Sequence, residues 1–330
     1  MRYGNLKKNK DKNILIVGDL MLDEYIVGDD YSISDEAPVP ILKVDRFDTR
    51  LGGAANVANN LKHLGYGVLL CGAVGSFTIG RSSMRLLESL RHSKIATDLL
   101  VESGLKTTTK TRVIINRQQV VRYDFEDTSI PESAESRICY LLENLDISNV
   151  DIIIVSDYNK GVVSKKVMDI ISGFNKKVII DPKPNNIKLY RNAFCITPNL
   201  KEFNDIVKNN LDESDIKGIA SNCKDVISKY GIKNIIVTIG PRGSVFCSKD
   251  KSIFVVGQKK EVANTIGAGD TFVAAFSFSI CSGLSVIDSL KVAHTASFIS
   301  VSKKYTSVCS FEELSSYAES DNIEFNCIDI

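Results

Sequence analysis

Tryptophan is absent from this 330-residue sequence, histidine occurs only three times, and no apolar stretch reaches the roughly 18 residues of a membrane-spanning helix. The histidines, His63, His92 and His294, are too dispersed to suggest a zinc site. The eight cysteines are also scattered and form no C-x-x-C pair, which is typical of reduced thiols. Because a signal peptide is lacking too, we expect a cytoplasmic protein without a membrane partner.

An excess of either charge is lacking as well, since 41 Lys and Arg residues face 40 Asp and Glu residues, for a net charge of +1. Proteins that bind nucleic acid usually carry a clear positive excess, so we expect no nucleic-acid partner. Lysines do concentrate in residues 1–12, which we expect to form a solvated basic tail. Residues 13–330 suffice for one large core and are expected to form a single domain.

Short, almost continuously apolar runs alternate along the chain with segments of helical pattern. Because such strands are buried on both faces, the pattern predicts an α/β fold with a doubly wound, mostly parallel central sheet flanked by helices. The runs lie at 14–17, 68–71, 152–155, 178–180 and 235–237, a hairpin pattern at 243–257, and the helices near 53–64, 80–91, 132–144, 163–172, 215–230, 271–282, 286–301 and 311–319.

Two segments, from about 24–47 and 107–125, break this alternation. Both have strand patterns, and no helical pattern lies within either of them. We expect them to form a small β-sheet inserted into the domain, either as a lid over a site or as an oligomer surface.

Gly267, Ala268 and Gly269 precede Asp270 and an apolar run that predicts a helix. Small residues let an anion approach backbone N–H groups, and the N-terminus of a helix favours phosphate. Asp270 would then accept the proton of an attacking hydroxyl. The same residues would also suit a tight loop capped by Asp270, so this motif alone leaves both interpretations open.

Charged side chains follow several of the predicted strands. Asp19 and Asp23 follow the first one, Asp157 and Lys160 follow the run at 152–155, and Lys183 follows the run at 178–180. Open α/β sheets bind ligands at the carboxyl ends of their strands, where carboxylates can hold sugar hydroxyls. Capping of turns is the alternative for the aspartates.

Glycines precede two of the predicted helices. Gly52 and Gly53 lie before a helix that carries Asn56 in its first turn, so backbone and amide could reach a polar ligand, although close helix packing uses the same small residues. Residues 75–82 resemble a phosphate loop, but Arg81 replaces the lysine that reaches the terminal phosphates, so we regard them as a weak candidate.

Asn199 and Glu202 have the spacing of the N-cap and N3 residues of a helix. A capping box therefore competes with Mg²⁺ or phosphate binding as the explanation for this pair. Thr238, Gly240 and Gly243 form a turn after a predicted strand, where the glycines could border the phosphates of a nucleotide.

In their order and spacing these motifs resemble the ribokinase-like carbohydrate kinase family over residues 13–315, and finer features resemble its heptose 7-phosphate kinase branch. The branch-like segments are Val17–Tyr25, Glu36–Pro40, Thr109–Val113, Asn116–Gln119, Arg122–Glu126, Ser156–Gly161 and Asp181–Lys183.

The resemblance implies a ribokinase-like fold with a β lid that mediates a homodimer, and transfer of a phosphoryl group from ATP, with Mg²⁺, to a sugar hydroxyl. For the branch, the acceptor is the anomeric hydroxyl of D-glycero-D-manno-heptose 7-phosphate, and the 1,7-bisphosphate formed serves ADP-heptose and lipopolysaccharide core synthesis. Bifunctional relatives carry a nucleotidyltransferase domain as well, and the resemblance covers their kinase half.

By the same resemblance, Asp270 is the catalytic base and Gly267, Ala268 and Gly269 form its anion hole. Glu202 would bind Mg²⁺ largely through water. The nucleotide would contact Asn199, Glu202, Thr238, Gly240, Gly243 and His294. The sugar phosphate would contact Asp19, Asp23, Gly52, Gly53, Asn56, Arg112, Gln118, Asp157, Lys160 and Lys183.

A substrate that already carries a phosphate needs cationic donors at that end. The cations of the expected lid, Lys110, Arg112, Arg117 and Arg122, are candidates beside Lys160 and Lys183, and a solvated lid face is the alternative for the four on the lid.

The sequence departs from these relatives at several positions. Asn264 and Ile266 replace an Asp and a Thr or Ser in a segment that also helps to hold a monovalent cation, which leaves activation by K⁺ open, and an acidic residue common in the loop at 76–79 is missing. Ser32 stands where the branch usually has Arg, His294 where it has Asn, and Tyr305 where it has Gly.

Two other functions remain open from the sequence. One is a kinase for another sugar or sugar phosphate, such as fructose 1-phosphate or ribose. The other is a catalytically weak regulator that binds a sugar or nucleotide, which the departures at Asn264, Ile266 and His294 suggest.

Overall fold

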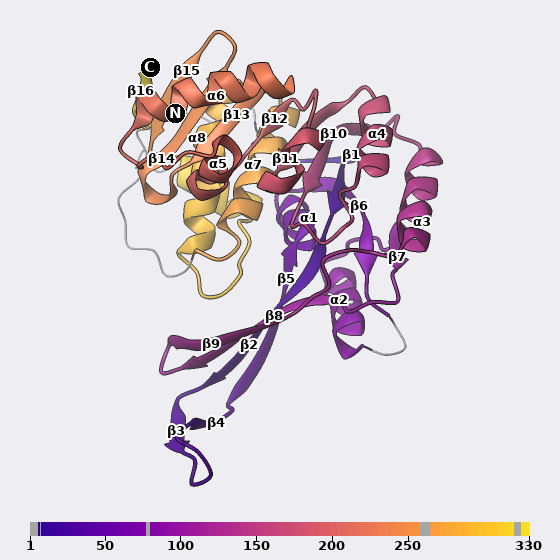
Figure 1. The fold of residues 1–330 in the computed structure, drawn as a ribbon, viewed down its shortest axis with the longest axis vertical. Helices are drawn as coiled ribbons and strands as arrows, with labels where there is room; N and C mark the ends of the chain where they lie inside the picture. The colour runs from indigo at the N-terminus through magenta and orange to yellow at the C-terminus, as the bar shows by residue number, and fades with distance from the viewer. Residues whose placement is uncertain (1–5, 7, 77–79, 258–264, 320–324) are drawn as a thin grey trace.

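The computed structural model describes residue 6 and residues 8–76, 80–257, 265–319 and 325–330, and it is built around a large central sheet (Figure 1). Within this part of the chain, the sheet has ten strands in the order β16-β15-β14-β13-β12-β11-β10-β1-β6-β7. The strands from β13 to β7 in this order run parallel, and β14 to β16 are antiparallel additions at one edge. Their bounds are β1 Asn9–Gly18, β6 Tyr66–Val74, β7 Leu100–Glu102, β10 Val150–Ser156, β11 Lys177–Asp181, β12 Cys195–Ile196, β13 Asn234–Thr238, β14 Gly243–Ser248, β15 Ser252–Val256 and β16 Cys327–Asp329.

Helices cover both faces of the sheet, as the doubly wound pattern predicts. On β1, successive side chains point to opposite faces, so Ile14 and Ile16 join one buried apolar cluster, while Leu15 and Val17 join the other. The first cluster includes residues of α1 Ala54–His63, α2 Arg81–His92, α7 Ala268–Cys281, α8 Val286–Val301 and α9 Phe311–Glu319. The second includes residues of α3 Glu132–Glu143, α4 Lys165–Gly173, α5 Leu200–Val207 and α6 Ile216–Tyr230.

A second, smaller sheet projects from the main body (Figure 1) and confirms the expected lid. Its strand order is β5-β2-β8-β9, with β2 parallel to β8, and a hairpin of β3 and β4 extends it. Strand β2 begins two residues after β1 ends, so the lid is connected directly to the carboxyl edge of the main sheet. The bounds are β2 Leu20–Gly28, β3 Asp30–Ile33, β4 Pro40–Lys43, β5 Arg46–Gly53, β8 Thr108–Ile115 and β9 Gln118–Phe125.

The main differences from the sequence-based expectations lie at the ends of elements and in short elements. Strand β1 begins at Asn9 and pairs there with Tyr66, so residues 9–12 of the expected tail belong to the sheet. Strands β7, β12 and β16 and the 3₁₀ helices η1 Pro184–Leu189 and η2 Gly240–Arg242 are too short to leave a periodic pattern. No helix in the described residues is both long and apolar enough to cross a membrane.

Candidate active site

Helix α7 begins at a tight backbone turn next to α1. Its N-cap, Gly267, has a φ of +76°, a left-handed conformation that favours glycine. A Cβ atom at this position would lie 2.8 Å from Nδ2 of Asn56. Both the backbone conformation and the lack of space therefore disfavour a larger residue here. The glycine therefore brings the first turn of α7, with Asp270, against the first turn of α1. The Ala268 N–H of this turn donates to the Thr265 carbonyl oxygen over 3.3 Å, and the first N–H groups of a helix are of the kind that bind anions.

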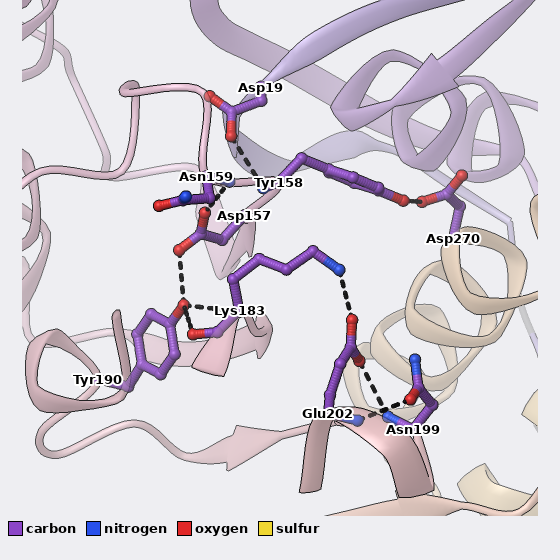
Figure 2. A network of polar contacts seen from close by, with 9 residues as sticks. All are labelled: Asp19, Asp157, Tyr158, Asn159, Lys183, Tyr190, Asn199, Glu202 and Asp270. Atoms are coloured by element: carbon purple, nitrogen blue, oxygen red, sulfur yellow. Dashed lines mark hydrogen bonds and ion pairs between the residues drawn. The ribbon is translucent and has the colours of Figure 1, made fainter. Parts of the chain in front are cut away.

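Asp270 is buried, and each of its carboxylate oxygens accepts a hydrogen bond. Asn56 Nδ2 donates to Oδ2 over 2.8 Å. The Tyr158 hydroxyl donates to Oδ1 over 2.7 Å, as Figure 2 shows. Burial raises the pKa of Asp270 to about 6, although the two hydrogen bonds oppose this rise. A carboxylate with this pKa is ionised at neutral pH and more basic than an exposed one, as a general base should be.

Asp19 holds the loop that follows β10. Its carboxylate accepts three backbone N–H groups, from Tyr158 at 2.8 Å, Lys160 at 3.0 Å and Val162 at 3.2 Å. Burial nevertheless raises the pKa of Asp19 to about 6. The predicted contact of Asp19 with a sugar hydroxyl stays a prediction. In the structure, Asp19 fixes the loop that carries Tyr158.

Asp157 is also buried and occupied by protein donors. It accepts hydrogen bonds from the Tyr190 hydroxyl at 2.6 Å, from Asn186 Nδ2 at 2.7 Å and from the backbone of Asn159 at 2.7 Å (Figure 2 shows the first and last). Lys160, on the same loop, forms an ion pair of 2.8 Å with Glu126, at the end of the lid. Both residues therefore have structural partners beside the predicted sugar site.

Asn199 and Glu202 form the capping box that was one interpretation of their spacing. The Asn199 side chain accepts from the Glu202 backbone at 2.9 Å, and Glu202 Oε2 accepts from the Asn199 backbone at 3.1 Å. The other oxygen, Oε1, is paired with Lys183 Nζ (Figure 2). Burial, the largest single influence, lowers the pKa of Lys183, but the charge and hydrogen bond of Glu202, together with the charges of Asp181 and Asp157, raise it above its ordinary value.

A cavity of about 220 Å³ opens over this pair. Asp181, at the end of β11, lines it with Lys183 and Glu202, and burial followed by the charge of Glu202 raises the pKa of Asp181 well above its usual value. The cavity thus carries one cation and two carboxyl groups next to the N-terminus of α7. In the described residues, no cluster of three or more Asp, Glu, His or Cys side chains has the arrangement of a metal site.

A second, more apolar cavity of about 210 Å³ is also lined by this turn, through Ala268 and Gly269. The two cavities share Thr238, Gly269 and Phe272, so together they lead from a slot between β13 and α8 to the first turn of α7. The slot is lined further by Gly240, Pro241, Gly257, Thr265, Ala268, His294, Thr295, Ser297, Phe298, Val301 and Phe325.

His294 lies within this slot and was predicted to contact the nucleotide. Its Nε2 is hydrogen-bonded to Ser244 Oγ over 2.8 Å, and its ring packs edge to face against Phe272. Burial lowers the pKa of His294 to about 4, so the ring is neutral at pH 7. Gly243, by contrast, lies against β15, where a Cβ atom would be 1.9 Å from the Val255 carbonyl oxygen, and this close approach accounts for a glycine there.

A third cavity, of about 610 Å³, lies between the lid and residues 304–305 and is larger than the two described above. At its inner end Arg112 forms a buried ion pair of 2.7 Å with Asp23, and the Thr306 hydroxyl donates to the same carboxylate over 2.9 Å. Gly52 is adjacent, because a Cβ atom there would lie 3.0 Å from Asp23 Oδ2. The lining contains four cationic and two acidic residues, namely Arg46, Arg112, Arg117, Lys304, Asp29 and Asp45.

The other predicted lid residues are distributed unevenly around this cavity. Arg117 lines it, whereas Arg122 is half exposed and paired with Asp124. Gln118 lies on the exposed strand β9, and its neighbour Gln119 lines the cavity instead. Asn264 and residues 77–79 lie outside the described residues.

Two tyrosines belong to the site although they were not predicted for it. Tyr158 contacts Asp270, and its only sequence signal is its position directly after Asp157 on a loop that follows a strand. Tyr305 packs against Tyr25 with tilted rings whose centroids are 4.6 Å apart, and its hydroxyl accepts a hydrogen bond from Arg46. Its φ of +60° suits a glycine better than a tyrosine.

The family match defines a phosphotransferase whose acceptor is an alcohol group. The chain belongs to the pfkB family of carbohydrate kinases, whose profile matches residues 11–313.

Similar proteins include two described as "Bifunctional protein HldE". That of Aliarcobacter butzleri is 34% identical over 94% of this chain, and that of Sulfurimonas denitrificans is 35% identical over 95%. The match covers 65% of each, so the chain spans about two thirds of the length of these relatives.

Solved structures with the same fold include phosphofructokinase-2 from Escherichia coli and a ribokinase from Thermotoga maritima. The first has a TM-score of 0.77 at 19% identity and covers 93% of this chain and 98% of its own. The second has a TM-score of 0.71 at 19% identity and covers 94% of this chain and 100% of its own. At these identities the likeness establishes the ribokinase-like fold, with its β lid, and no more.

Proposed function

We propose that the chain is a kinase that transfers the γ-phosphoryl group of ATP to the anomeric hydroxyl of D-glycero-D-manno-heptose 7-phosphate. The observation that carries the proposal is the position of Asp270, at the turn where an apolar slot and a charged cavity meet. The branch-like lid motifs and the similarity to the HldE proteins support a heptose phosphate as the acceptor. The product would be a heptose 1,7-bisphosphate for ADP-heptose and lipopolysaccharide core synthesis in the cytoplasm.

In this reaction Asp270 would take the proton of the anomeric hydroxyl while the oxygen of that hydroxyl attacks the γ-phosphorus. The bond from the γ-phosphorus to the bridging oxygen of ATP breaks, and ADP leaves. Asn56 would orient the carboxylate, and the backbone N–H groups of Gly267, Ala268 and Gly269 would face the charge that develops on the transferred group. Because only the ionised form of Asp270 can accept a proton, activity should fall as the pH drops through about 6, the pKa of this carboxyl.

The residues around the two nucleotide-side cavities fit ATP and Mg²⁺. The apolar slot with Phe272 and neutral His294 suits an adenine ring. Lys183 was predicted to contact the sugar phosphate, but it lines the charged cavity beside this slot, where it offers a cation for a phosphate of the nucleotide. Glu202 already holds Lys183 and its own helix cap, so it would bind the ion through water. When bound, Mg²⁺ neutralises phosphate charge during the transfer.

The cavity under the lid fits the phosphate that the acceptor already carries. Arg112 is fixed by Asp23, and Arg117, Arg46 and Lys304 surround the remaining space. Arginine binds phosphate through two parallel N–H groups, so a cavity with three arginines favours a phosphorylated sugar over a neutral one. Asp23 would then contact the sugar end of the acceptor, next to Gly52.

A substrate panel tests the proposal. ADP release is measured with ATP and Mg²⁺, with and without K⁺, for heptose 7-phosphate, fructose 1-phosphate, fructose 6-phosphate and ribose. We expect kcat/KM for heptose 7-phosphate to exceed that for ribose by about 10²-fold or more, because ribose leaves the cationic cavity unpaired. A preference for ribose would reject the proposal, and tight binding of ATP and sugar without ADP release would indicate a regulator.

We further propose a homodimer through the lid. Of the fourteen large apolar side chains that are exposed in the described residues, ten lie at positions 31–47 or 120–125, on or beside lid strands. Such a concentration of exposed apolar side chains is typical of a protein interface. The lid residues are Tyr31, Ile33, Val39, Ile41, Val44, Phe47, Val120, Val121, Tyr123 and Phe125.

Replacing Tyr123 with lysine should therefore shift the protein from dimer to monomer, because a charge would be buried in the interface. The measurement is the mass in solution by size-exclusion chromatography with light scattering. Tyr140→Lys is the matched control, since Tyr140 is even more exposed but lies on α3, away from the lid. A wild-type monomer, or an unchanged mass for Tyr123→Lys, would contradict the lid interface.

A further inference from the structure

Tyr158 is anchored at both ends. Its backbone N–H is held by Asp19 over 2.8 Å, and its hydroxyl donates to Asp270 over 2.7 Å (Figure 2). The loop that follows Tyr158 is fixed by Asp19 as well, which accepts hydrogen bonds from the backbone N–H groups of Lys160 and Val162. These contacts hold the Tyr158 side chain with its hydroxyl directed at Oδ1 of Asp270, the proposed base.

The ring of Tyr158 also lies between two cations from different parts of the fold. Lys110 Nζ, from lid strand β8, is 5.3 Å from the ring centroid, and Lys183 Nζ, from the nucleotide side, is 5.1 Å from it. Both distances are within the range of a cation–π contact. Tyr158 is thus in contact with the lid, the phosphate side and the base at once.

The direction of the hydrogen bond between Tyr158 and Asp270 is fixed by chemistry. Burial, followed by the negative charge of Asp270, raises the pKa of Tyr158 well above its ordinary value. The hydroxyl therefore keeps its proton over the working range of pH and acts as the donor, while the ionised carboxylate accepts. A hydrogen bond of this kind favours the charged form of the acceptor.

We propose that Tyr158 is a positioning residue for the phosphoryl transfer: its hydroxyl orients the Asp270 carboxylate and keeps it ionised, so that the carboxylate can accept the proton of the sugar hydroxyl. The inference rests on the proposed role of Asp270 as the base, but not on which sugar is the acceptor. Tyr158 itself need not gain or lose a proton in the reaction.

Other groups also act on Asp270 from the elements around it. Asn56 on α1 donates a second hydrogen bond, and Lys110 on β8 favours the ionised form. The negative charges of Asp23 on β2 and Asp181 on β11 disfavour it, as does burial. Because burial is the largest influence, removal of one of the two donors should leave a carboxyl that is harder to ionise.

Tyr158→Phe tests the proposal, because it removes the hydroxyl and keeps the ring between the two lysines. Loss of a hydrogen bond to a charged group corresponds to a shift of about one pKa unit or more. The midpoint of the acid limb of the kcat/KM profile should therefore move upward by about one pH unit. Activity relative to the wild type should fall more at pH 6 than at pH 8.

Tyr190→Phe is the matched comparison. Tyr190 belongs to the same network and is buried, but its hydroxyl contacts Asp157 and Lys183 instead of Asp270. Its loss should leave the midpoint of the acid limb where the wild type has it, whatever it does to the rate. Thermal melts of both variants show whether they are folded under assay conditions.

The pH profile of kcat/KM is recorded with the best acceptor of the substrate panel. The test of Tyr158 therefore remains valid if the acceptor is a sugar other than heptose 7-phosphate. An upward shift for Tyr158→Phe that Tyr190→Phe does not show would support the proposal. An unmoved midpoint for Tyr158→Phe, or equal shifts in both variants, would overturn it. If Asp270→Asn proved fully active, the proposed base would fail, and Tyr158 would lose its role with it.

Discussion

Replacing Asp270 with asparagine should reduce kcat by about 10²–10⁴-fold or more, because the amide cannot take the proton of the attacking hydroxyl. Asparagine keeps the size of the side chain and can still accept a hydrogen bond from Asn56 or Tyr158. The measurement is the rate of ADP release with the preferred acceptor at saturating ATP. A variant that retains full turnover would show that Asp270 is not the base.

The same substitution should increase the stability of the fold at neutral pH. The folded pKa of Asp270, about 6, lies above the ordinary value of 3.8, so the folded state binds the proton more tightly than the unfolded state does. Stability due to this group is therefore present at low pH and is lost as the pH rises from about 4 to 6. Asparagine avoids that loss, which is worth about 2–3 kcal/mol by linkage. Denaturant unfolding of the wild type and of Asp270→Asn at pH 5 and pH 7.5 measures the difference in the free energy of unfolding and how it depends on pH. It also shows whether the variant is folded, so that a loss of activity can be told from a loss of structure.

Removing Arg112 should produce the largest loss of stability among the lid residues. Arg112→Ala leaves Asp23 as a buried charge without its ion-pair partner, and breaking a buried pair in this way costs about 3–5 kcal/mol. It should also raise KM for the phosphorylated acceptor, since the arginine lines the cavity under the lid. The free energy of unfolding and KM are measured on the same preparation.

The matched control lies directly opposite on the next strand. Arg122 pairs with Arg112 in the register of β8 and β9, but it is half exposed and its ion pair with Asp124 faces solvent. Exposed ion pairs contribute about 0–1 kcal/mol, so Arg122→Ala should change stability little. Equal losses in the two variants would mean that the lid as a whole, and not the buried pair, is responsible. Partial recovery in Asp23→Asn with Arg112→Met would show that the unpaired charge is the cause.

The sequence alone predicted the elements that have a periodic apolar pattern and the turn that requires a glycine. The buried strands and long helices follow from periodicity, and the turn before α7 follows from a position that only glycine can occupy. The lid could be predicted because two segments of strand pattern contained no helix. The start of β1 at Asn9 could not, because its first residues are polar and gain their place by pairing with β6.

The candidate site could be proposed from the sequence as a set of strand-end residues, but the contacts among these residues could not be predicted. That Asp19 holds three backbone N–H groups, or that Glu202 serves a helix cap and Lys183 together, depends on loops that a single sequence does not position. Tyr158 and Tyr305 were missed for a related reason. A tyrosine in a loop has no periodic signal, and its hydroxyl finds a distant partner only when the strands are assembled.

Phosphorus NMR of the reaction with ATP and heptose 7-phosphate tests the central claim most directly. The account predicts ADP together with a sugar that carries two phosphates, one unchanged at C7 and one newly attached at the anomeric carbon. Asp270→Asn should form this product at least about 10²-fold more slowly. The account would be contradicted if the new phosphate stood on another hydroxyl, or if no ADP formed with this sugar while an unphosphorylated pentose was phosphorylated readily.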